Sequence, residues 1–395
     1  MWLLTGIALR MGQRLNPWDD GGNFQDRSIY DVQLRRRLWW QIIWLDGRSH
    51  QASGQKILFT DAINFPLPAN LNDSDISPNM TEMPPIHKGP TEMTFCLIRY
   101  EMGKFLTEAG KKLHSPQTSV PEKDEIIDAF EDLIEEKYLR YLDPAITVHM
   151  IAAGGGRAAI WKMRLMAHHP AQYSDKGKSM PQSEHDKLFS WSVQLVECHV
   201  EGKATKDLDC FSWHLDAIFQ VDAFVFMLIE SRSQPPTSPL TEKAWHLVAE
   251  TYKFRPGLLK DSTNTLHAAV NELTLRAWEA REKEVARRGL EPIAVPPIIF
   301  TLRDRIRNNM LLPSAMDAQP EVQTVYQTTV DPTQAGAGFD INHVNVGLSQ
   351  PLAQPNVGYL FDGIFDTFTG EVGLSDWGAV NWDDWNTLIE RNFVP

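Results

Sequence analysis

Carboxylates grouped in one short stretch are the first side chains in this chain that could do chemistry. Asp73, Asp75 and Glu82 could hold Mg²⁺ and a diphosphate, because this cation prefers oxygen ligands. The stretch around them is rich in proline and asparagine and lacks helical periodicity. Asn and Asp side chains cap turns in such segments by hydrogen-bonding to the backbone. We therefore expect Asn72 and its neighbours to cap turns rather than to form a metal site.

Three further motifs could support catalysis or phosphate binding, and the spacing of each argues against that role. Cys198 and His199 are adjacent, which on a helix turns their side chains about 100° apart and separates a nucleophile from its base. Glycines 154–156 lack the Lys-Ser/Thr that completes a phosphate loop, so we expect a flexible or closely packed helical segment. The pair His168-His169 is expected to end a helix, where the polar or cationic imidazole groups would interact with the last backbone carbonyls of that helix. We predict no catalytic, cofactor-binding or metal-ligating residue, and no enzyme.

The distribution of charge argues against a duplex-binding surface. The chain has 395 residues and a net charge of −13. Residues 1–307 carry 40 acidic and 37 basic groups, whereas residues 308–395 carry 11 acidic groups and a single base, Arg391. Neither part offers the clustered Lys and Arg that displace counterions from a duplex. The three cysteines form no C-x-x-C pair and suit a reducing compartment. The N-terminus lacks the basic region of a signal peptide, and no apolar run reaches the roughly 18 residues of a membrane span.

Apolar residues at helical spacing predict the elements that carry these groups. Helices are expected near 4–15, 34–45, 91–113, 121–138, 145–168, 185–200, 211–231, 241–254 and 263–288. Leu4, Ile7 and Met11 form the apolar stripe of the first helix, and that of the second contains Leu34, Leu38, Trp39, Ile42, Ile43 and Leu45. The proline-rich stretch 61–90 is expected to be extended and turn-rich. No β-α-β rhythm occurs, so the sequence predicts an all-α, multi-helix domain over residues 1–300.

The last part of the chain has a different composition. Residues 308–356 are rich in Gln, Asn, Pro, Ala and Gly without amphipathic period, which predicts a disordered linker. Residues 357–395 alternate aromatic and acidic side chains, a composition typical of activation segments that fold into a partner's groove. The residues expected to bind a coactivator are Trp377, Trp382, Trp385, Leu388, Ile389 and Phe393. The alternative is that these aromatics dock on the helical body as a C-terminal latch.

Four blocks of this sequence, taken in their order and spacing, resemble those of a known family. They are Thr5-Gly-Ile-Ala-Leu-Arg-Met11, Leu34-Arg-Arg-Arg-Leu-Trp-Trp40 with Leu45-Asp46-Gly-Arg48, Leu67-Pro-Ala-Asn-Leu-Asn-Asp-Ser-Asp75, and Lys162-Met-Arg-Leu-Met-Ala-His-His-Pro170. Together with Trp213-His214 and Ala244-Trp245 they resemble the fungal-specific transcription factor domain, the regulatory region of fungal zinc-cluster regulators, over residues 1–290. The motif residues, to which the resemblance gives structural roles, are Arg35, Arg36, Arg37, Trp39, Trp40, Asp46, Asp73 and Asp75.

The resemblance implies an all-helical regulatory domain without established catalytic residues, in a nuclear regulator of RNA polymerase II genes. Its implied partners are transcriptional coactivators, a second copy of the chain, a small-molecule effector and DNA, with no membrane. In that family DNA is bound through a six-cysteine module that holds two Zn(II) ions. The present sequence does not contain this module, so we expect a truncated gene model, no zinc in this chain, and DNA contact only through a missing or partner module.

Several alternatives stay open at the level of sequence. The basic run 35–37 is either a nuclear import signal or DNA patch, or a solvated face that pairs with carboxylates such as Asp31 or Asp46. The aromatic residues of the 211–231 stretch either pack in the core or surround a ligand pocket; they are Phe211, Trp213, Phe219, Phe224 and Phe226. A helical lyase or cyclase of secondary metabolism and a non-functional fragment are the other whole-chain hypotheses. The acidic-aromatic tail favours the regulator, because an enzyme has no need of it.

Overall fold

The computed structural model describes residues 2–14, 28–53, 65–115, 117–170, 173, 179–217, 219–260 and 265–311. Within these ranges the chain is all-α and contains no strand, which confirms the predicted fold class. The helices are α1 (Trp2–Arg14), α2 (Ile29–Ser53), α3 (Thr94–His114), α4 (Val120–Lys137), α5 (Thr147–Ala167), α6 (Gln182–Ala204), α7 (Ser212–Ala217), α8 (Val221–Glu230), α9 (Pro239–Phe254), α10 (Gly257–Lys260), α11 (Thr265–Arg287) and α12 (Pro297–Leu311). Short 3-10 turns lie at Asp73–Asp75, Leu139–Tyr141 and Lys206–Phe211.

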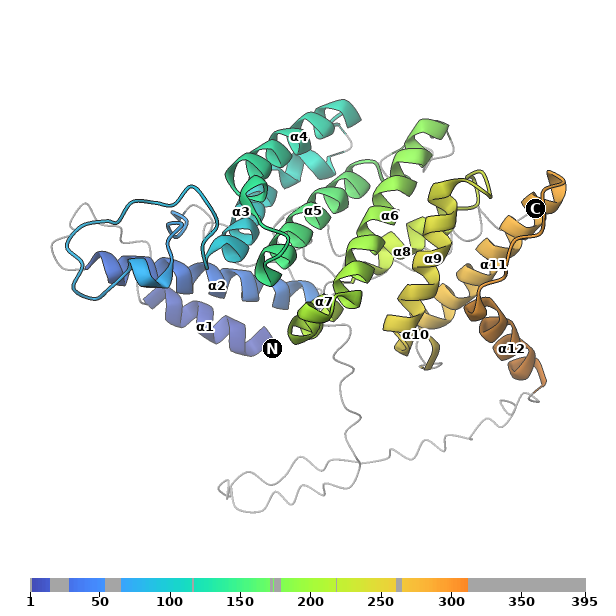
Figure 1. Ribbon diagram of the computed structural model, residues 1–395. Coiled ribbons are helices and arrows are strands. Elements are labelled where there is room, and N and C mark those ends of the chain that lie inside the picture. The colour runs from blue at the N-terminus through green and yellow to red at the C-terminus, as the bar shows by residue number, and fades with distance from the viewer. Residues whose placement is uncertain are drawn as a thin grey trace, which may run out of the picture.

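The helices follow one another along a row, from the α1–α2 hairpin at one end to α11 and α12 at the other (Figure 1). Two large hydrophobic cores and two smaller clusters are buried in the described part of this row. The first large core joins α1 to α5 around Trp39, Trp40 and Ile127, and the second joins α6 and α8 to α12 around Phe189 and Trp278. Each smaller cluster contains residues of α5 together with residues of α6 and α8 or of α7. Helices α5 and α6 pack against each other at the centre. Contacts between these two helices therefore connect the halves of the molecule.

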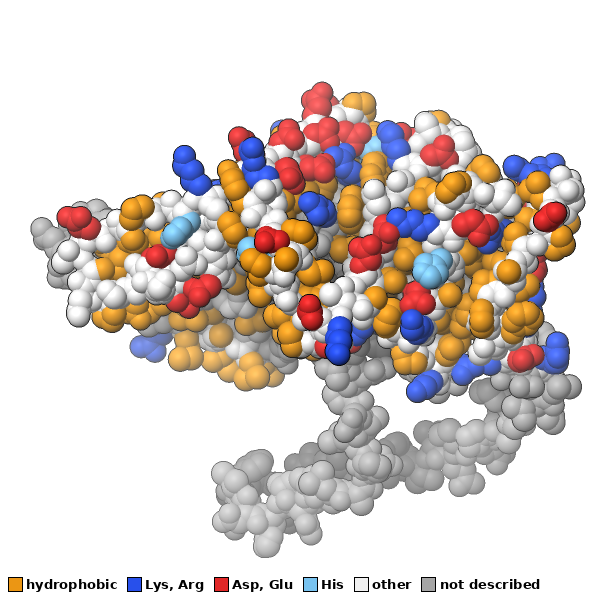
Figure 2. Space-filling model, viewed as in Figure 1, with side chains coloured by type: hydrophobic (Ala, Val, Ile, Leu, Met, Phe, Trp, Pro, Cys, Tyr) orange, Lys and Arg blue, Asp and Glu red, His pale blue; other side chains and the backbone are white. Residues whose placement is uncertain are grey.

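Helix α4 shows how local sequence fixes an element. Ser119 accepts a hydrogen bond from the backbone N–H of Glu122, and the Glu122 carboxylate accepts one from the backbone N–H of Ser119 at 2.9 Å. This capping box satisfies donors that a helix start leaves unpaired. Ile127, Phe130 and Ile134 then fall on one buried face. The opposite face is acidic, and Figure 2 shows red side chains gathered over α4 at the top of the molecule.

Two elements differ from the sequence prediction. The stretch 211–231 is not one helix, because the segments Lys206–Asp216 and Val221–Glu230 meet at 96°. Gln220 has extended backbone angles at the break, and the Phe219 ring is buried with its centroid 4.7 Å from that of His199. The second difference is α12, which was not predicted. Its first residue is Pro297, where proline is tolerated because the N–H is unpaired in any case.

The first helix buries another face than predicted, whereas the second buries Trp39 and Ile43 of its predicted stripe but not the leucines. In α1, Leu4, Ile7 and Met11 are exposed, and Leu9 is buried instead. The core residues of α2 are Trp39, Trp40, Ile43 and Trp44, while Leu34, Leu38 and Leu45 are exposed. Large aromatic side chains bury more apolar area than leucine, which explains why the tryptophan face of α2 turns inward. Figure 2 shows the exposed apolar side chains along the lower edge of the molecule, over α1.

The predicted C-terminal segments fall mostly outside the described residues. Residues 308–311, placed by sequence in the linker, belong to α12, because Ile298, Ile299 and Leu302 anchor this helix in the second core. Residues 312–356 of the linker and the whole segment 357–395 lie outside the described ranges. Among the residues that are described, no single helix has the length and apolar character to cross a membrane; only the bent pair on either side of residue 218 meets both criteria when its two parts are taken together.

Candidate functional site

The family-motif residues of α2 and of the loop 65–92 meet in one junction. The Arg37 guanidinium contacts the Asp73 carboxylate at 2.5 Å and donates to the carbonyl of Leu71 at 3.1 Å. Trp40 donates its indole N–H to the carbonyl of Pro66 at 3.1 Å. The two sequence blocks, far apart in the chain, thus form a single contact that fastens the loop to α2.

Polar side chains within the loop hold its shape. The carboxylate of Asp75 accepts from the backbone N–H of Asn72 at 2.7 Å and lies 2.8 Å from His87 Nε2. Both interactions lower the pKa of Asp75, the backbone hydrogen bond at residue 72 most strongly. The predicted turn capping by Asn72 and its neighbours is therefore confirmed. Among the described residues, no group of three or more His, Cys, Asp or Glu side chains has an arrangement that could hold a metal ion.

The other family-motif residues take up positions on α2. Arg35 and Arg36 are half-buried, so the basic run is not a fully solvated face. Asp46 is buried, with 3% of its surface exposed. Trp39 packs edge-on against Phe65, with ring centroids 5.7 Å apart. The carboxylate that pairs with Arg37 comes from the loop, at Asp73, and not from within α2.

Asn70 is the residue on which the loop depends most. Its amide nitrogen donates to the carbonyls of His87 and Gly89, each at 2.9 Å, and its oxygen accepts from the hydroxyl of Thr91 at 2.6 Å. We expect Asn70→Ala to lower the free energy of unfolding by about 2 kcal/mol, since it removes two partly buried hydrogen bonds and one exposed one, each of which contributes about 0.5–1.5 kcal/mol. Urea denaturation checks this. The control Asp73→Asn should cost less than about 0.5 kcal/mol, because its carboxylate is exposed, and equal losses in both variants would contradict the assignment.

The block from Lys162 to Pro170 forms a second polar junction, at the end of α5. Lys162 pairs with Asp222 of α8. Arg164 pairs with Glu131, and with Asp128 of α4 at 2.7 Å. This block therefore ties α5 to one helix on each side of it.

His168 is the most enclosed member of this junction. Its imidazole has no exposed surface, and its Nε2 lies 2.8 Å from the carboxylate of Asp124. Its Nδ1 contacts Glu184, which lies in the first turn of α6. Burial raises the pKa of Glu184, but hydrogen bonds from Lys187 and His168 outweigh it and leave this pKa below its ordinary value. The predicted helix end at His168 is confirmed, but its imidazole binds carboxylates of α4 and α6, and not carbonyls.

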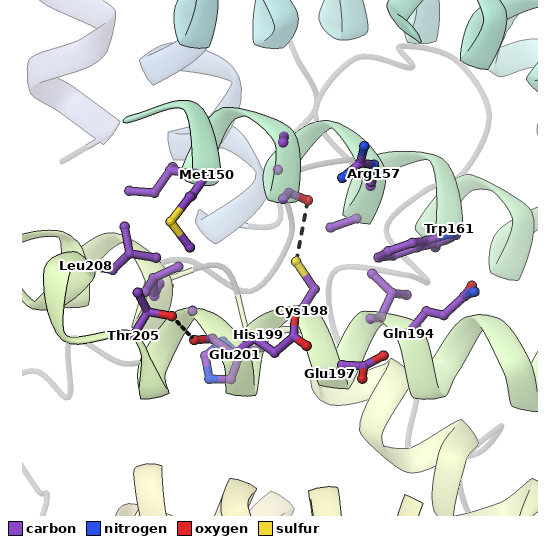
Figure 3. A pocket seen from close by; sticks show the side chains of 18 of the residues that line it. Met150, Arg157, Trp161, Gln194, Glu197, Cys198, His199, Glu201, Thr205 and Leu208 are labelled. Atoms are coloured by element: carbon purple, nitrogen blue, oxygen red, sulfur yellow. Dashed lines mark hydrogen bonds between the residues drawn. The ribbon is translucent and has the colours of Figure 1, made fainter. Parts of the chain in front are cut away.

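A cavity of about 450 Å³ opens between α5 and α6, and Figure 3 shows the side chains that line it. On α5 its wall includes Gly154, Gly155 and Trp161, and on α6 it includes Cys198 and His199. The Cys198 thiol points at α5, 3.6 Å from the carbonyl of Gly154, whereas His199 leaves α6 in another direction (Figure 3). This agrees with the predicted divergence of the adjacent pair. Burial raises the pKa of the Cys198 thiol to about 12, so the thiol is a poor nucleophile.

The cavity was not located by sequence. The alternative placed a pocket among the aromatic residues of 211–231, but none of those five aromatics lines this cavity. Phe219, Phe224 and Phe226 are buried in the core, whereas Trp213 is 68% exposed. The signal that could have found the cavity is the triple glycine 154–156, because glycines facing a neighbouring helix leave room. The residues predicted to bind a coactivator all lie outside the described residues; they are Trp377, Trp382, Trp385, Leu388, Ile389 and Phe393.

Comparison with known proteins finds a family match in the first part of the chain. The model of the fungal-specific transcription factor domain matches residues 1–132, which include α1, α2 and the loop junction. No solved structure matches the chain significantly.

Relatives that match longer parts of the chain are all named as transcription factors. The aurofusarin cluster transcription factor of Gibberella zeae is 28% identical over 406 residues, covering 99% of this chain and 58% of that protein. The pyriculol/pyriculariol biosynthesis cluster transcription factor 1 of Pyricularia oryzae is 25% identical, covering 81% and 45%. A C6 finger domain transcription factor of Aspergillus fumigatus is 30% identical, covering 64% and 34%.

This chain therefore spans about half the length, or less, of these relatives. The names of the family and of the relatives are those of transcription factors and not of enzymes. Residues 1–132 are therefore similar to the fungal-specific transcription factor domain, and the relatives that match more of the chain are named as transcription factors.

Proposed function

We propose that this protein acts as the regulatory and activating part of a fungal transcriptional regulator of RNA polymerase II genes, and that its targets belong to a biosynthetic gene cluster. The observation that carries this is the domain match at residues 1–132, joined to relatives named as transcription factors of such clusters. The helices described within residues 2–311 form the regulatory part. The acidic-aromatic residues 357–395 bind the coactivator.

The polar junctions support a regulatory role rather than a catalytic one. The charged side chains of the motif blocks contact one another across helices: Arg37 with Asp73, and Arg164 with Asp128. The one cysteine in the cavity wall has a raised pKa, and the two histidines of the α5 end contact carboxylates or an aromatic ring. These groups hold helices in place.

The activating role of the tail gives a direct test. The full chain, fused to an unrelated DNA-binding module, should activate a reporter gene in a fungal cell. Trp382, Trp385 and Leu388 recur at helical spacing, and each buried aromatic anchor contributes roughly 1.5–3 kcal/mol to binding a groove. The double variant Trp382→Ala, Trp385→Ala should therefore remove most of the activation.

A matched variant separates this result from a general effect of altering the tail. Replacing Asp383 and Asp384 with Asn should reduce activation less, since charges at the edge of an interface mainly accelerate encounter. A silent reporter, together with a lower melting temperature of the double Trp variant, would support the latch and contradict activation by the tail.

The remaining partners follow from the family and are part of this proposal. The protein enters the nucleus, and it contacts DNA through a zinc-cluster module that is supplied by another polypeptide or by sequence outside this chain. A second copy of the chain and a small-molecule effector are the other partners. The exposed apolar side chains of α1 and α2 support a protein partner, because contiguous patches of this kind mark interaction surfaces. A fluorescent fusion that stays out of the nucleus would contradict the localisation.

A further inference from the structure

Helix α1 carries an apolar stripe that no described element covers. Leu4, Ile7 and Met11, which we call the α1 stripe, are 72%, 54% and 63% exposed. At about 100° per residue, these three side chains fall within about 60° of one another around the helix. The opposite side of α1 packs on α2, since a Cβ added to Gly12 would lie 3.1 Å from the Trp39 ring. Adjoining exposed apolar side chains, unlike single ones, mark interaction surfaces.

The charge of α1 indicates what kind of partner fits the stripe. The helix contains two basic residues, Arg10 and Arg14, and no acidic one. Both arginines are exposed, and neither forms an ion pair within the part of the chain that the structure describes. A second copy of α1 would bring the same cations to the contact and no carboxylate, which is unfavourable. The helix therefore fits a partner that combines apolar side chains with acidic ones.

The C-terminal part of this chain has that pattern. Trp382, Trp385 and Ile389 are three and then four positions apart, the same spacing as in the α1 stripe. Helices with this spacing can pack stripe against stripe. Residues 376–391 also carry four acidic residues and a single base. Their net charge is thus opposite to that of α1.

The chain is long enough for this segment to reach α1. Residues 312–381 join the end of α12 to Trp382, and about 70 residues span up to roughly 230 Å when fully extended. Even if all the described helices lay side by side at about 10 Å spacing, the row would measure only about 120 Å. The segment can therefore contact the α1 stripe of its own molecule although α12 lies at the other end of the row (Figure 1).

We propose that residues 376–391 dock on the α1 stripe of the same molecule, antiparallel to α1. Their three apolar side chains cover the stripe, and Asp383 and Asp384 lie beside Arg10 and Arg14. The docking itself does not depend on any role in transcription. Only its consequence, competition between the stripe and a coactivator for the same side chains, rests on the proposed function.

The test measures binding of a fluorescently labelled peptide of residues 371–395 to the purified full chain by fluorescence anisotropy. The full-chain variant Trp382→Ala, Trp385→Ala should bind the peptide. The parent should bind it about tenfold more weakly, because its own tethered segment competes. Adding Ile7→Asp to the double variant should weaken binding about tenfold or more, since it places a charge in the apolar contact. Phe300→Asp is the matched control: Phe300 is 55% exposed on α12, and its replacement should leave binding unchanged.

Charge reversal tests the orientation of the segment. In the same double variant, Arg10→Glu with Arg14→Glu should weaken binding of the natural peptide about threefold, as exposed ion pairs allow. A peptide with Asp383→Lys and Asp384→Lys should recover the lost affinity on this variant. Weakening without recovery would contradict the antiparallel placement.

Three results would overturn the docking: no binding of the peptide to the double Trp variant, equal binding to this variant and to the parent, or unchanged binding after Ile7→Asp. Light scattering that shows a dimer which Ile7→Asp converts to a monomer would assign the α1 stripe to a second copy and would overturn it as well. A silent reporter with peptide binding intact contradicts only the proposed activation. An active reporter without peptide binding contradicts only the docking.

Discussion

Replacing His168 with alanine should destabilise the protein by about 3–5 kcal/mol, because it removes a fully buried ring that contacts two carboxylates, and a hydrogen bond to a charged group contributes about 1.5–3 kcal/mol. The imidazole is fully buried between Asp124 of α4 and Glu184 of α6. Without it each carboxylate keeps only its other cation, Arg164 at 3.9 Å from Asp124 and Lys187 at 2.8 Å from Glu184. Since a single domain of this kind has only about 5–15 kcal/mol of stability in total, the variant should lose a large part of it. Chemical denaturation monitored by circular dichroism measures the change.

A compensated variant separates the loss of charge pairing from the loss of packing. In His168→Leu combined with Asp124→Asn and Glu184→Gln, no carboxylate remains unpaired, and much of the lost stability should return, because an apolar replacement of a whole buried ionic group is often neutral. The single variant His168→Leu is the comparison. If the loss in His168→Ala comes only from the empty space that the ring leaves, His168→Leu should be as stable as the triple variant. A loss below about 1 kcal/mol in His168→Ala would mean that the contact does not support the fold.

The helices of this protein are predictable from sequence because their signals are local. The apolar period of α4, with Ser119 and Glu122 at its start, gives the element, its first turn and its buried face. The break near Phe219 is not predictable in the same way, because it depends on a ring that packs against His199 of another helix. In α12 a proline that usually ends helices begins one.

Which helix faces are buried, and where ion pairs and cavities lie, depends on contacts between distant segments that local sequence patterns do not predict. The apolar stripe of Leu4, Ile7 and Met11 satisfies the helical period, but it is exposed, since α1 packs on α2 through the face that contains Leu9. The pairing of Arg37 with Asp73 joins residues 36 positions apart, and sequence offered nearer carboxylates. The triple glycine indicated close packing, which holds at Gly154 and Gly156, but the space beside Gly155 becomes visible only once α6 is in place.

Acid should unfold this protein earlier than an average helical domain, because two of its histidines, the buried His199 and the half-buried His169, are held in a neutral form. Burial lowers the pKa of both His169 and His199 to about 3, and nearby cations, Lys162 for the first and Arg255 for the second, act in the same direction. The unfolded chain binds protons at these histidines below about pH 6.5, whereas the folded chain does not until the pH approaches 3. Stability must therefore fall as the pH falls through this window, by up to about 1.4 kcal/mol per pH unit for each histidine.

Between pH 7 and pH 5 the two histidines together should remove about 4 kcal/mol from the free energy of unfolding, about 2 kcal/mol each. Urea denaturation at both pH values measures this difference. His185 acts in the opposite direction, because its hydrogen bond to Glu230 raises its pKa. It therefore offsets part of the loss in the free energy of unfolding between pH 7 and pH 5. Because His185 is present in every variant, it does not affect the comparison between them. His169→Leu and His199→Leu should each remove half of the pH dependence attributed to the pair, and the double variant should remove all of it, whatever the stability of each variant at pH 7. Additive loss of the slope in the two single variants assigns it to these two rings; a slope that survives in the double variant would assign acid sensitivity to the carboxylate contacts at the end of α5 instead.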